Sequence, residues 1–201
     1  GWTLPGVMTP GAAQAMLKSH GTLVGEKILL AGTGPFLLSV ASNLSDAGAS
    51  IVGIYEFNRR WRWLFNLHGL LLNPGKIKEA IYYLTKLRRA GVKIRYGKFD
   101  LRAERGFATI NGVRSECNVV AAGWGFTPDV SLASILGSTL KVDRDGNTVV
   151  QVNSRQETSI HNLYAAGEST GIGGSSAAIA EGIVAGGGGA RFYRWRTKVF
   201  A

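Results

Sequence analysis

The sequence predicts an α/β fold, a Rossmann-like parallel sheet with flanking helices. Two patterns of buried strands, at residues 27–31 and 50–55, enclose apolar residues at helical spacing. Such a strand–helix–strand unit is nearly always parallel and right-handed. The chain has 201 residues, 45% of them hydrophobic, and can therefore bury one large core or two small ones. Its 28 glycines follow no period and gather at turn positions, which is typical of a turn-rich α/β chain.

The first strand leads directly into a glycine turn. This turn is Gly32-Thr33-Gly34, and a helical pattern follows it. Pro35 suits the first helical position, where the N–H that proline lacks would have no partner within the helix. The helical pattern ends near residue 46, and the second strand ends at Glu56, 22 positions after Gly34.

Turn signals between apolar runs define the other elements. A connector is predicted over residues 1–24, with a short helix near residues 12–19. Asn111-Gly112 is a strong signal for the tight turn of a hairpin. The remaining elements are predicted as helices over residues 77–89 and 175–195, hairpins over 107–115 and 141–152, and strands over 92–96, 118–122 and 162–166.

Charge and cysteine content limit the classes of function. The formal net charge is +10, and residues 59–63 interleave arginine with tryptophan, as single-strand nucleic-acid binders do. No nucleic-acid motif accompanies this charge, so we interpret it as a surface for a partner protein. The single cysteine, Cys117, excludes an internal disulfide and a redox pair; we expect it to pack as a small apolar residue in a reducing, cytoplasmic compartment. No apolar run is long enough for a membrane helix, which predicts a soluble chain.

Metal and nucleophile sites are not predicted. The histidines, His20, His68 and His161, lie in separate segments without ligand-like spacing. Glu181, in the last predicted helix, is interpreted as a structural residue. No acid–base pair stands out, so no catalytic residue is assigned.

The first candidate site is the turn that contains Gly32 and Gly34. These glycines allow a tight turn and close approach to a pyrophosphate, and Glu56 is suitably spaced to bind a ribose hydroxyl. The pattern predicts a site for NAD(P) or another adenine nucleotide, formed by Gly32, Thr33, Gly34, Pro35 and Glu56. The third glycine of the fingerprint is replaced by Leu37, which should push the helix away from the strand. The alternative is a retained fold with a weakened or absent nucleotide site.

The second candidate site lies in residues 163–174, where an apolar strand ends at Gly167 and Glu168 follows at once. A carboxylate at the carboxyl end of a strand can accept hydrogen bonds from sugar hydroxyls. Gly173 and Gly174 would let backbone N–H groups approach a phosphate or a ring, and a helix of small residues follows. This order indicates half of a nucleotide cofactor site. A glycine-rich turn without a ligand is the alternative.

Four segments resemble a single family: residues 1–15, 31–35, 122–128 and 163–186. The family is the FAD/NAD(P)-binding pyridine-nucleotide-disulfide-reductase-like superfamily. Within it, the chain is most similar to the subunits of opine oxidases, hydrogen cyanide synthase and dye-linked proline dehydrogenases. The resemblance implies a connector from an FAD domain (1–24), an inserted NAD(P)-type dinucleotide-binding domain (25–120) and the C-terminal part of an FAD-binding domain (121–201).

The chain departs from this family in three respects. The N-terminal FAD-binding unit, with its own glycine fingerprint, is missing before Gly1, so we expect a fragment or a processed chain. Glu168 stands where aspartate is usual, and the cysteine-rich iron–sulfur segment of some relatives is absent. The resemblance implies that Glu168 contacts the ribityl chain of FAD, and that this chain carries about half of the FAD site.

The resemblance implies a subunit, or part of one, of an FAD-dependent oxidoreductase. It would pass electrons from an amine or amino-acid-type small-molecule substrate, oxidised largely on a partner subunit, to an acceptor. Disulfide reduction is excluded because the chain has no cysteine pair. The alternative is a non-catalytic subunit of an oxidoreductase complex that binds an adenine nucleotide or serves as a scaffold.

Overall fold

The computed structural model describes residues 3–58 and 74–199, and the chain divides into two compact units. Unit 1 comprises residues 1–125 and unit 2 comprises residues 126–201. The arginine–tryptophan segment 59–63, interpreted above as part of a partner surface, lies outside the described residues.

A five-stranded sheet, parallel throughout, forms the centre of unit 1. Its order is β1-β8-β2-β3-β4. The strands are β1 (Val7–Met8), β8 (Val119–Gly123), β2 (Lys27–Gly32), β3 (Ser50–Glu56) and β4 (Ile94–Tyr96). This sheet confirms the predicted fold class.

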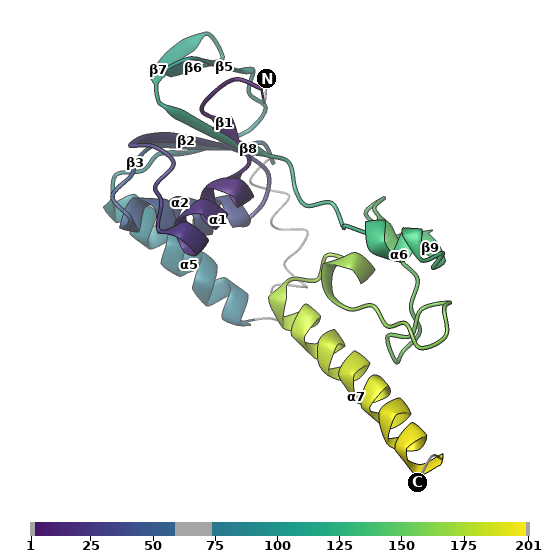
Figure 1. Cartoon of the computed structure of the whole chain (residues 1–201). Coiled ribbons are helices and arrows are strands. Elements are labelled where there is room, and N and C mark those ends of the chain that lie inside the picture. Colours follow the sequence, from purple (N-terminus) through teal and green to yellow (C-terminus); the bar gives the residue numbers. More distant parts are fainter. Residues whose placement is uncertain (1–2, 59–73, 200–201) are drawn as a thin grey trace. The chain divides into compact units, whose positions relative to one another are not determined.

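Each face of this sheet is covered by a different layer (Figure 1). Helices α1, α2 and α5 lie on one face, and a three-stranded antiparallel sheet, β5-β6-β7, lies on the other. The elements are α1 (Pro10–His20), α2 (Phe36–Asp46), α5 (Pro74–Arg89), β5 (Leu101–Glu104), β6 (Phe107–Ile110) and β7 (Val113–Glu116).

The two covered faces explain the apolar runs in the sequence. In β2, Ile28 and Leu30 belong to the core beneath the helices, whereas Leu29 and Ala31 belong to the core beneath the antiparallel sheet. All four are fully buried. A parallel strand buried on both faces reads as a continuous apolar run, which is the pattern that predicted β2.

The helix starts follow local capping chemistry. Thr9 caps α1 by accepting the Ala12 N–H at 3.1 Å, and Pro10 opens the helix two residues earlier than predicted. Pro35, predicted as the first helical residue, is instead the N-cap of α2, and the helix begins one residue later at Phe36, although the φ of Pro35, −66°, is already helical. Proline fixes φ near this value, so the shift is small.

Residues 3–24 do not form a separate segment. Strand β1 pairs with β8, and Ala13 of α1 is fully buried in the helix-side core. They therefore belong to unit 1. The assignment of residues 1–24 and 121–201 to an FAD domain, and of 25–120 to an NAD(P)-type domain, stays a prediction.

The predicted hairpin around Asn111-Gly112 is confirmed. Strands β6 and β7 pair antiparallel, and Asn111 and Gly112 have φ values of 49° and 80°. Two successive residues with positive φ define the type I′ turn that this residue pair favours. Strand β5, which completes this sheet, was not predicted.

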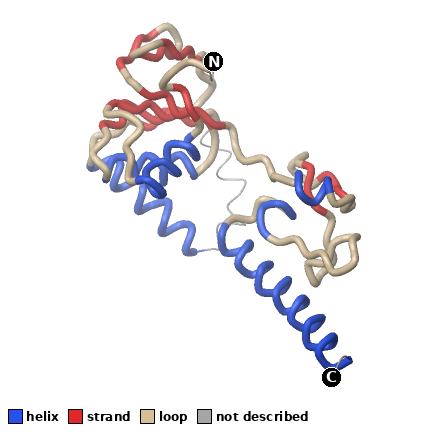
Figure 2. Tube along the Cα trace, in the orientation of Figure 1, coloured by secondary structure: helices blue, strands red, loops and turns tan. Residues whose placement is uncertain are grey.

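Unit 2 contains less regular structure (Figure 2). The predicted hairpin is confirmed, with short strands that turn at Gly146. The final helix is also confirmed and runs slightly beyond the predicted end. The elements are α6 (Ser131–Ile135), β9 (Leu140–Val142), β10 (Thr148–Val150), the 3₁₀ helix η1 (Gly167–Thr170) and α7 (Ser175–Val199).

The predicted strand over residues 162–166 is wrong. The structure has only an isolated antiparallel bridge between Glu157 and Tyr164, and Figure 2 draws the segment as loop. Two backbone hydrogen bonds accompany the bridge, Thr158 N–H to Leu163 O at 2.9 Å and Ala165 N–H to Gln156 O at 3.0 Å. A ladder this short does not make a strand, although the apolar sequence favours one.

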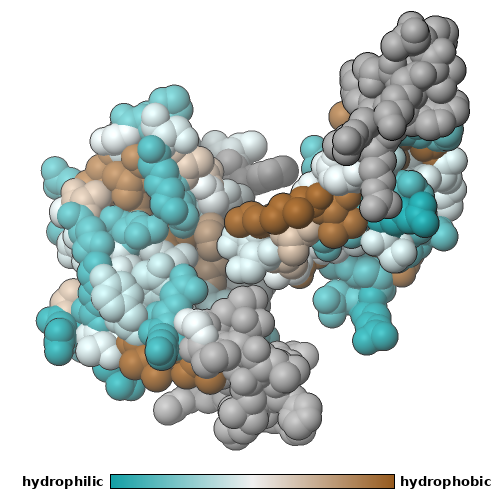
Figure 3. Space-filling model, turned by 90° about the horizontal axis from the view of Figure 1, so that it is seen from below, coloured by the Kyte–Doolittle hydropathy of each residue, from teal (hydrophilic) through white to brown (hydrophobic). Residues whose placement is uncertain are grey.

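Apolar side chains are exposed along the helices of unit 2. Ile179 and Ile183, one turn apart on α7, are 65% and 71% exposed, and Leu132 and Ile135 of α6 are also exposed. Figure 3 shows brown, hydrophobic surface on this unit. None of the described helices is both long and apolar enough for a transmembrane span.

We predict that Gly32→Ala destabilises unit 1 strongly. A Cβ at Gly32 would lie 1.7 Å from the Gly123 carbonyl oxygen, and Gly32 has a φ of +143°. We expect a loss of more than about 3 kcal/mol in the free energy of unfolding, measured by urea denaturation. Gly48→Ala is the control, because Gly48 also has positive φ but no atom lies within 4 Å of its Cβ position. It should cost about 1–2 kcal/mol, and equal losses in both variants would refute the steric argument.

Candidate functional site

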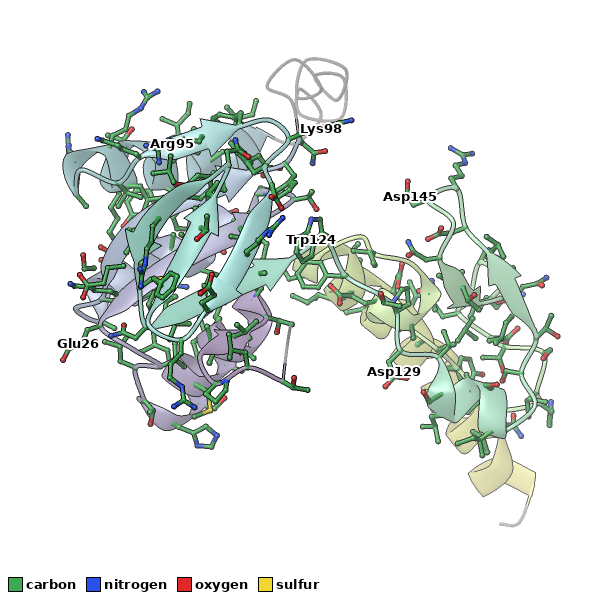
Figure 4. The ribbon with its side chains drawn as sticks, turned by 90° about the horizontal axis from the view of Figure 1, so that it is seen from above. Glu26, Arg95, Lys98, Trp124, Asp129 and Asp145 are labelled. Carbon is green, nitrogen blue, oxygen red and sulfur yellow. The ribbon has the colours of Figure 1, made fainter. Side chains whose placement is uncertain are left out.

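The first candidate site lies at the carboxyl edge of the parallel sheet in unit 1. In the strand register, Gly32 at the end of β2 faces both Glu56 of β3 and Gly123 of β8. The topology therefore brings the predicted turn and the predicted acid together at one edge, where ligands of such sheets bind. Figure 4 shows Trp124 and Lys98 at this end of unit 1, and Glu26 at the opposite end.

The first glycine of the turn is required by strand packing. The backbone of Gly32 approaches Gly123 so closely that a side chain would collide with the Gly123 carbonyl. That carbonyl also accepts the Thr33 N–H at 3.0 Å. Gly34 differs, because its φ is +98° and no atom lies within 4 Å of the position of a Cβ. A side chain would therefore have free space at Gly34 and none at Gly32.

Glu56 is buried, with 4% of its surface exposed. One carboxylate oxygen, Oε2, accepts the Gly34 N–H at 2.9 Å, and the other, Oε1, accepts the Asn58 N–H at 3.0 Å. Burial raises the pKa of Glu56 above its ordinary value, and the hydrogen bonds from Asn58 and Gly34 act in the opposite direction. Glu56 was predicted to bind a ribose hydroxyl. Both of its carboxylate oxygens instead accept backbone N–H groups, one of them from the glycine turn.

Leu37 occupies the position of the missing third glycine. Its side chain is 2% exposed and belongs to the helix-side core. This position therefore serves packing between α2 and the sheet. Taken together, the residues of the turn fit an adenine nucleotide only in part, because the glycines allow close approach while the carboxylate is already engaged.

An aromatic series beside this turn was missed by the sequence reasoning. The rings of Tyr55, Phe99, Phe57 and Trp124 meet edge to face in that order, with centroids 5.1, 5.5 and 5.9 Å apart. Arg95 lies over Tyr55 and donates to its hydroxyl at 2.8 Å. The alternation of aromatic residues at positions 55 and 57 was the available signal.

The second candidate site lies in unit 2, where η1 and the following loop connect to α7. Gly167, Gly171 and Gly174 have φ values of 81°, 147° and 81°, a region that favours glycine. The space around Gly173 is also limited, because a Cβ there would lie 2.7 Å from the Ala177 Cβ. The path of this loop therefore depends on glycine at four positions.

Glu181 of α7 holds the loop. Its Oε2 atom accepts the Gly167 N–H at 2.7 Å and the Thr170 hydroxyl at 2.9 Å. This arrangement confirms the structural role expected for Glu181. It also means that the Gly167 N–H is engaged within the protein.

Glu168 has a different environment from Glu181. It is exposed, and its carboxylate has no hydrogen-bond or ion-pair partner among the side chains and backbone groups that the structure describes. Gly173 is exposed as well. The loop thus presents an uncommitted carboxylate beside glycine backbone, and these residues fit the sugar hydroxyls of a nucleotide cofactor. Gly167, Glu168, Gly173 and Gly174 lie together in the region of η1 and the following loop, and their role in holding a cofactor stays a prediction.

Unit 2 also contains a recess of about 750 Å³ that no motif indicated. It is lined by mostly polar residues of the loop 155–162, by Tyr164, and by Val184 and Gly188 of α7. A Cβ at Gly188 would lie 2.8 Å from the Tyr164 ring, so glycine is needed for this packing.

Cys117 and the potential metal ligands add no further candidate site in the described part of the chain. Cys117 is 2% exposed and lies in the core beneath the antiparallel sheet, as expected for a cysteine that packs as a small apolar residue. Burial raises the pKa of its thiol. No group of three or more potential metal ligands gathers within the described part of the chain.

Comparison with curated proteins identifies relatives along most of the chain. It is 30% identical to hydrogen cyanide synthase subunit HcnB of Pseudomonas aeruginosa and 33% identical to an opine oxidase subunit of Agrobacterium tumefaciens. Both alignments cover 92% of this chain but only 43% and 39% of the relatives. The chain therefore spans about two fifths of the length of these proteins. No protein-family model matches it.

Solved structures share the fold at lower identity. An FAD-dependent pyridine nucleotide-disulphide oxidoreductase from Desulfovibrio vulgaris has a TM-score of 0.63 at 19% identity, over 94% of this chain and 49% of that one. The HOCl-induced flavoprotein disulfide reductase RclA from Escherichia coli has a TM-score of 0.58 at 17% identity, over 89% and 38%. These findings confirm the resemblance to the pyridine-nucleotide-disulfide-reductase-like superfamily: the chain is similar in sequence to HcnB and to the opine oxidase subunit, and in fold to the pyridine nucleotide-disulphide oxidoreductase.

Proposed function

We propose that this chain is part of a subunit of an FAD-dependent oxidoreductase that acts on an amine or amino-acid-type substrate. The observation that carries the proposal is the loop of residues 167–174, in which Glu168 is exposed and uncommitted beside glycines. The similarity to HcnB and to the opine oxidase subunit supports the reaction class. Glycine backbone beside this exposed carboxylate supports a nucleotide-type cofactor, because the backbone allows close approach and the carboxylate can accept hydrogen bonds from sugar hydroxyls.

The residues of the loop have distinct roles in this proposal. Glu168 accepts hydrogen bonds from the ribityl hydroxyls of FAD, and Gly173 and Gly174 allow close approach of the backbone. Glu181 keeps the loop in place from within the protein. The flavin, when bound, supplies the electron transfer, while the protein supplies orientation and electrostatics.

The exposed apolar face of unit 2 supports the proposal that this unit is part of a larger FAD domain. Ile179 and Ile183 leave a helix face without cover, and large exposed apolar patches mark interaction surfaces. Residues 163–166 pair with a neighbour through a single bridge. We propose that further segments of a longer protein cover α7 and supply the rest of the flavin site.

The positive charge of unit 1 supports the proposal that this unit binds a partner protein. This unit carries 16 of the 23 Lys and Arg residues but only 7 of the 13 Asp and Glu residues. A net positive surface favours association with an acidic partner. In the proposal, this partner is the subunit on which most of the substrate oxidation occurs.

A second candidate function is a non-catalytic scaffolding or nucleotide-binding subunit. It is favoured by unit 1, where Glu56 is engaged within the turn and Leu37 replaces the third glycine. The visible absorption spectrum of the purified full-length protein separates the two candidates. Bound flavin, or flavin regained when FAD is added, supports the oxidoreductase, whereas neither would refute it.

We predict that Glu168→Ala weakens FAD retention in the full-length protein. Loss of a charged acceptor for sugar hydroxyls should raise the Kd for FAD about tenfold, with little change in thermal stability, because the side chain is exposed. Fluorescence titration of the apoprotein measures this Kd. Asp145→Ala, an exposed acid elsewhere in unit 2, is the control. An unchanged Kd in Glu168→Ala would contradict the assigned role.

Glu181→Ala should affect both stability and FAD retention. It removes the acceptor for the Gly167 N–H and the Thr170 hydroxyl, so the loop loses its anchor on α7. We expect a loss of about 1–2 kcal/mol in the free energy of unfolding together with weaker FAD binding. Denaturation and flavin titration of the same sample measure both effects. Reduced FAD binding without any loss of stability would instead make Glu181 a direct ligand.

A further inference from the structure

At three successive positions of the turn after β2, residues 33–35, no backbone N–H group is available to bind a ligand. The Thr33 N–H donates to the Gly123 carbonyl at 3.0 Å, and the Gly34 N–H donates to Glu56 Oε2 at 2.9 Å. Pro35 has no N–H. A helix N-terminus usually offers such donors to the phosphates of a nucleotide. In residues 33–35, all described by the structure, these donors are engaged or absent.

Glu56 supplies the negative charge at this turn. Its carboxylate receives two backbone N–H groups, one through each oxygen, and it is 4% exposed. This is the geometry of an anion bound by a turn, with the carboxylate in the place of a phosphate. A ribose hydroxyl would have to enter a nearly closed space to reach either oxygen.

The surrounding chain keeps Glu56 in this position. The Glu56 carbonyl accepts the Gly97 N–H at 2.9 Å, and the Phe57 N–H donates to Gly32 O at 2.8 Å. The backbone on both sides of the carboxylate is therefore fixed to β2 and to the end of β4. The side chain is held against the turn rather than directed toward solvent.

We propose that Glu56 is a positioning residue that blocks the turn rather than a ribose ligand. Its carboxylate holds the Gly34 N–H in place of a nucleotide phosphate and repels an incoming pyrophosphate. Removal of its charge therefore strengthens the binding of an adenine dinucleotide. A ribose ligand has the opposite property, because its removal weakens binding. The proposal concerns unit 1 and does not rest on the proposed flavin site.

The test is a calorimetric titration of the chain with NAD⁺, in the wild type and in Glu56→Gln. Glutamine keeps the shape of the side chain, retains one acceptor oxygen and removes the charge. We expect NAD⁺ to bind Glu56→Gln at least about tenfold more tightly than the wild type, because a like charge is removed from a poorly solvated site. Glu26→Gln, an exposed acid at the opposite end of the sheet, should match the wild type.

An equal or weaker affinity in Glu56→Gln would overturn the proposal, as would the absence of NAD⁺ binding to a folded variant. A merely structural role of Glu56 would lower the thermal midpoint without raising the affinity, so both are measured on each sample. Glu56→Ala serves as the second variant if glutamine prevents folding. If neither variant folds, the wild type decides: a Kd for NAD⁺ weaker than about 100 μM supports the block, and a tighter one overturns it.

Discussion

The close approach of β2 and β8 at their carboxyl ends is the constraint on which the architecture of unit 1 depends. Gly32 and Gly123 meet backbone to backbone, with space for no side chain on Gly32. This contact lets the Thr33 N–H reach Gly123 O, while the next strand is tied by the Phe57 N–H to Gly32 O. Three strand ends are thereby joined at one edge by backbone hydrogen bonds. The turn, Glu56 and the aromatic series all take their positions from this edge.

The same constraint limits what the edge can bind. A glycine turn is suited to a phosphate because its backbone N–H groups are accessible. When strand packing and a buried carboxylate use those groups, the turn gains stability and loses capacity for a ligand. The raised pKa of Glu56 reflects this conflict, since burial disfavours the charge that the two N–H groups stabilise. A motif of glycines and an acid is therefore better evidence for the shape of the backbone than for the ligand that binds there.

Unit 1 could be predicted from the sequence largely because its signals are local. The strand β2, the helix α2 and the turn at Asn111-Gly112 each follow from an apolar run, a helical spacing or a residue pair with positive φ. The strand over residues 162–166 could not be predicted reliably, because a strand needs a neighbour and the sequence does not supply the pairing. The engagement of Glu56 was also beyond sequence reasoning, since spacing places an acid at the edge without indicating which way its carboxylate turns.

The two glycine loops share one structural device and differ in one respect that decides their chemistry. In unit 1 the Gly34 N–H donates to Glu56, and in unit 2 the Gly167 N–H donates to Glu181. Each glutamate fixes its loop from within the protein. Unit 2, however, has a second carboxylate, Glu168, which is exposed and has no partner in the described parts of the chain. In unit 1, by contrast, Glu56 is buried and both of its oxygens accept backbone N–H groups. A loop that is already anchored can hold its second carboxylate toward a ligand without losing its shape. For this reason the loop of unit 2 is the better candidate for a cofactor site, although the glycine–acid spacing of unit 1 looks closer to a nucleotide-binding motif.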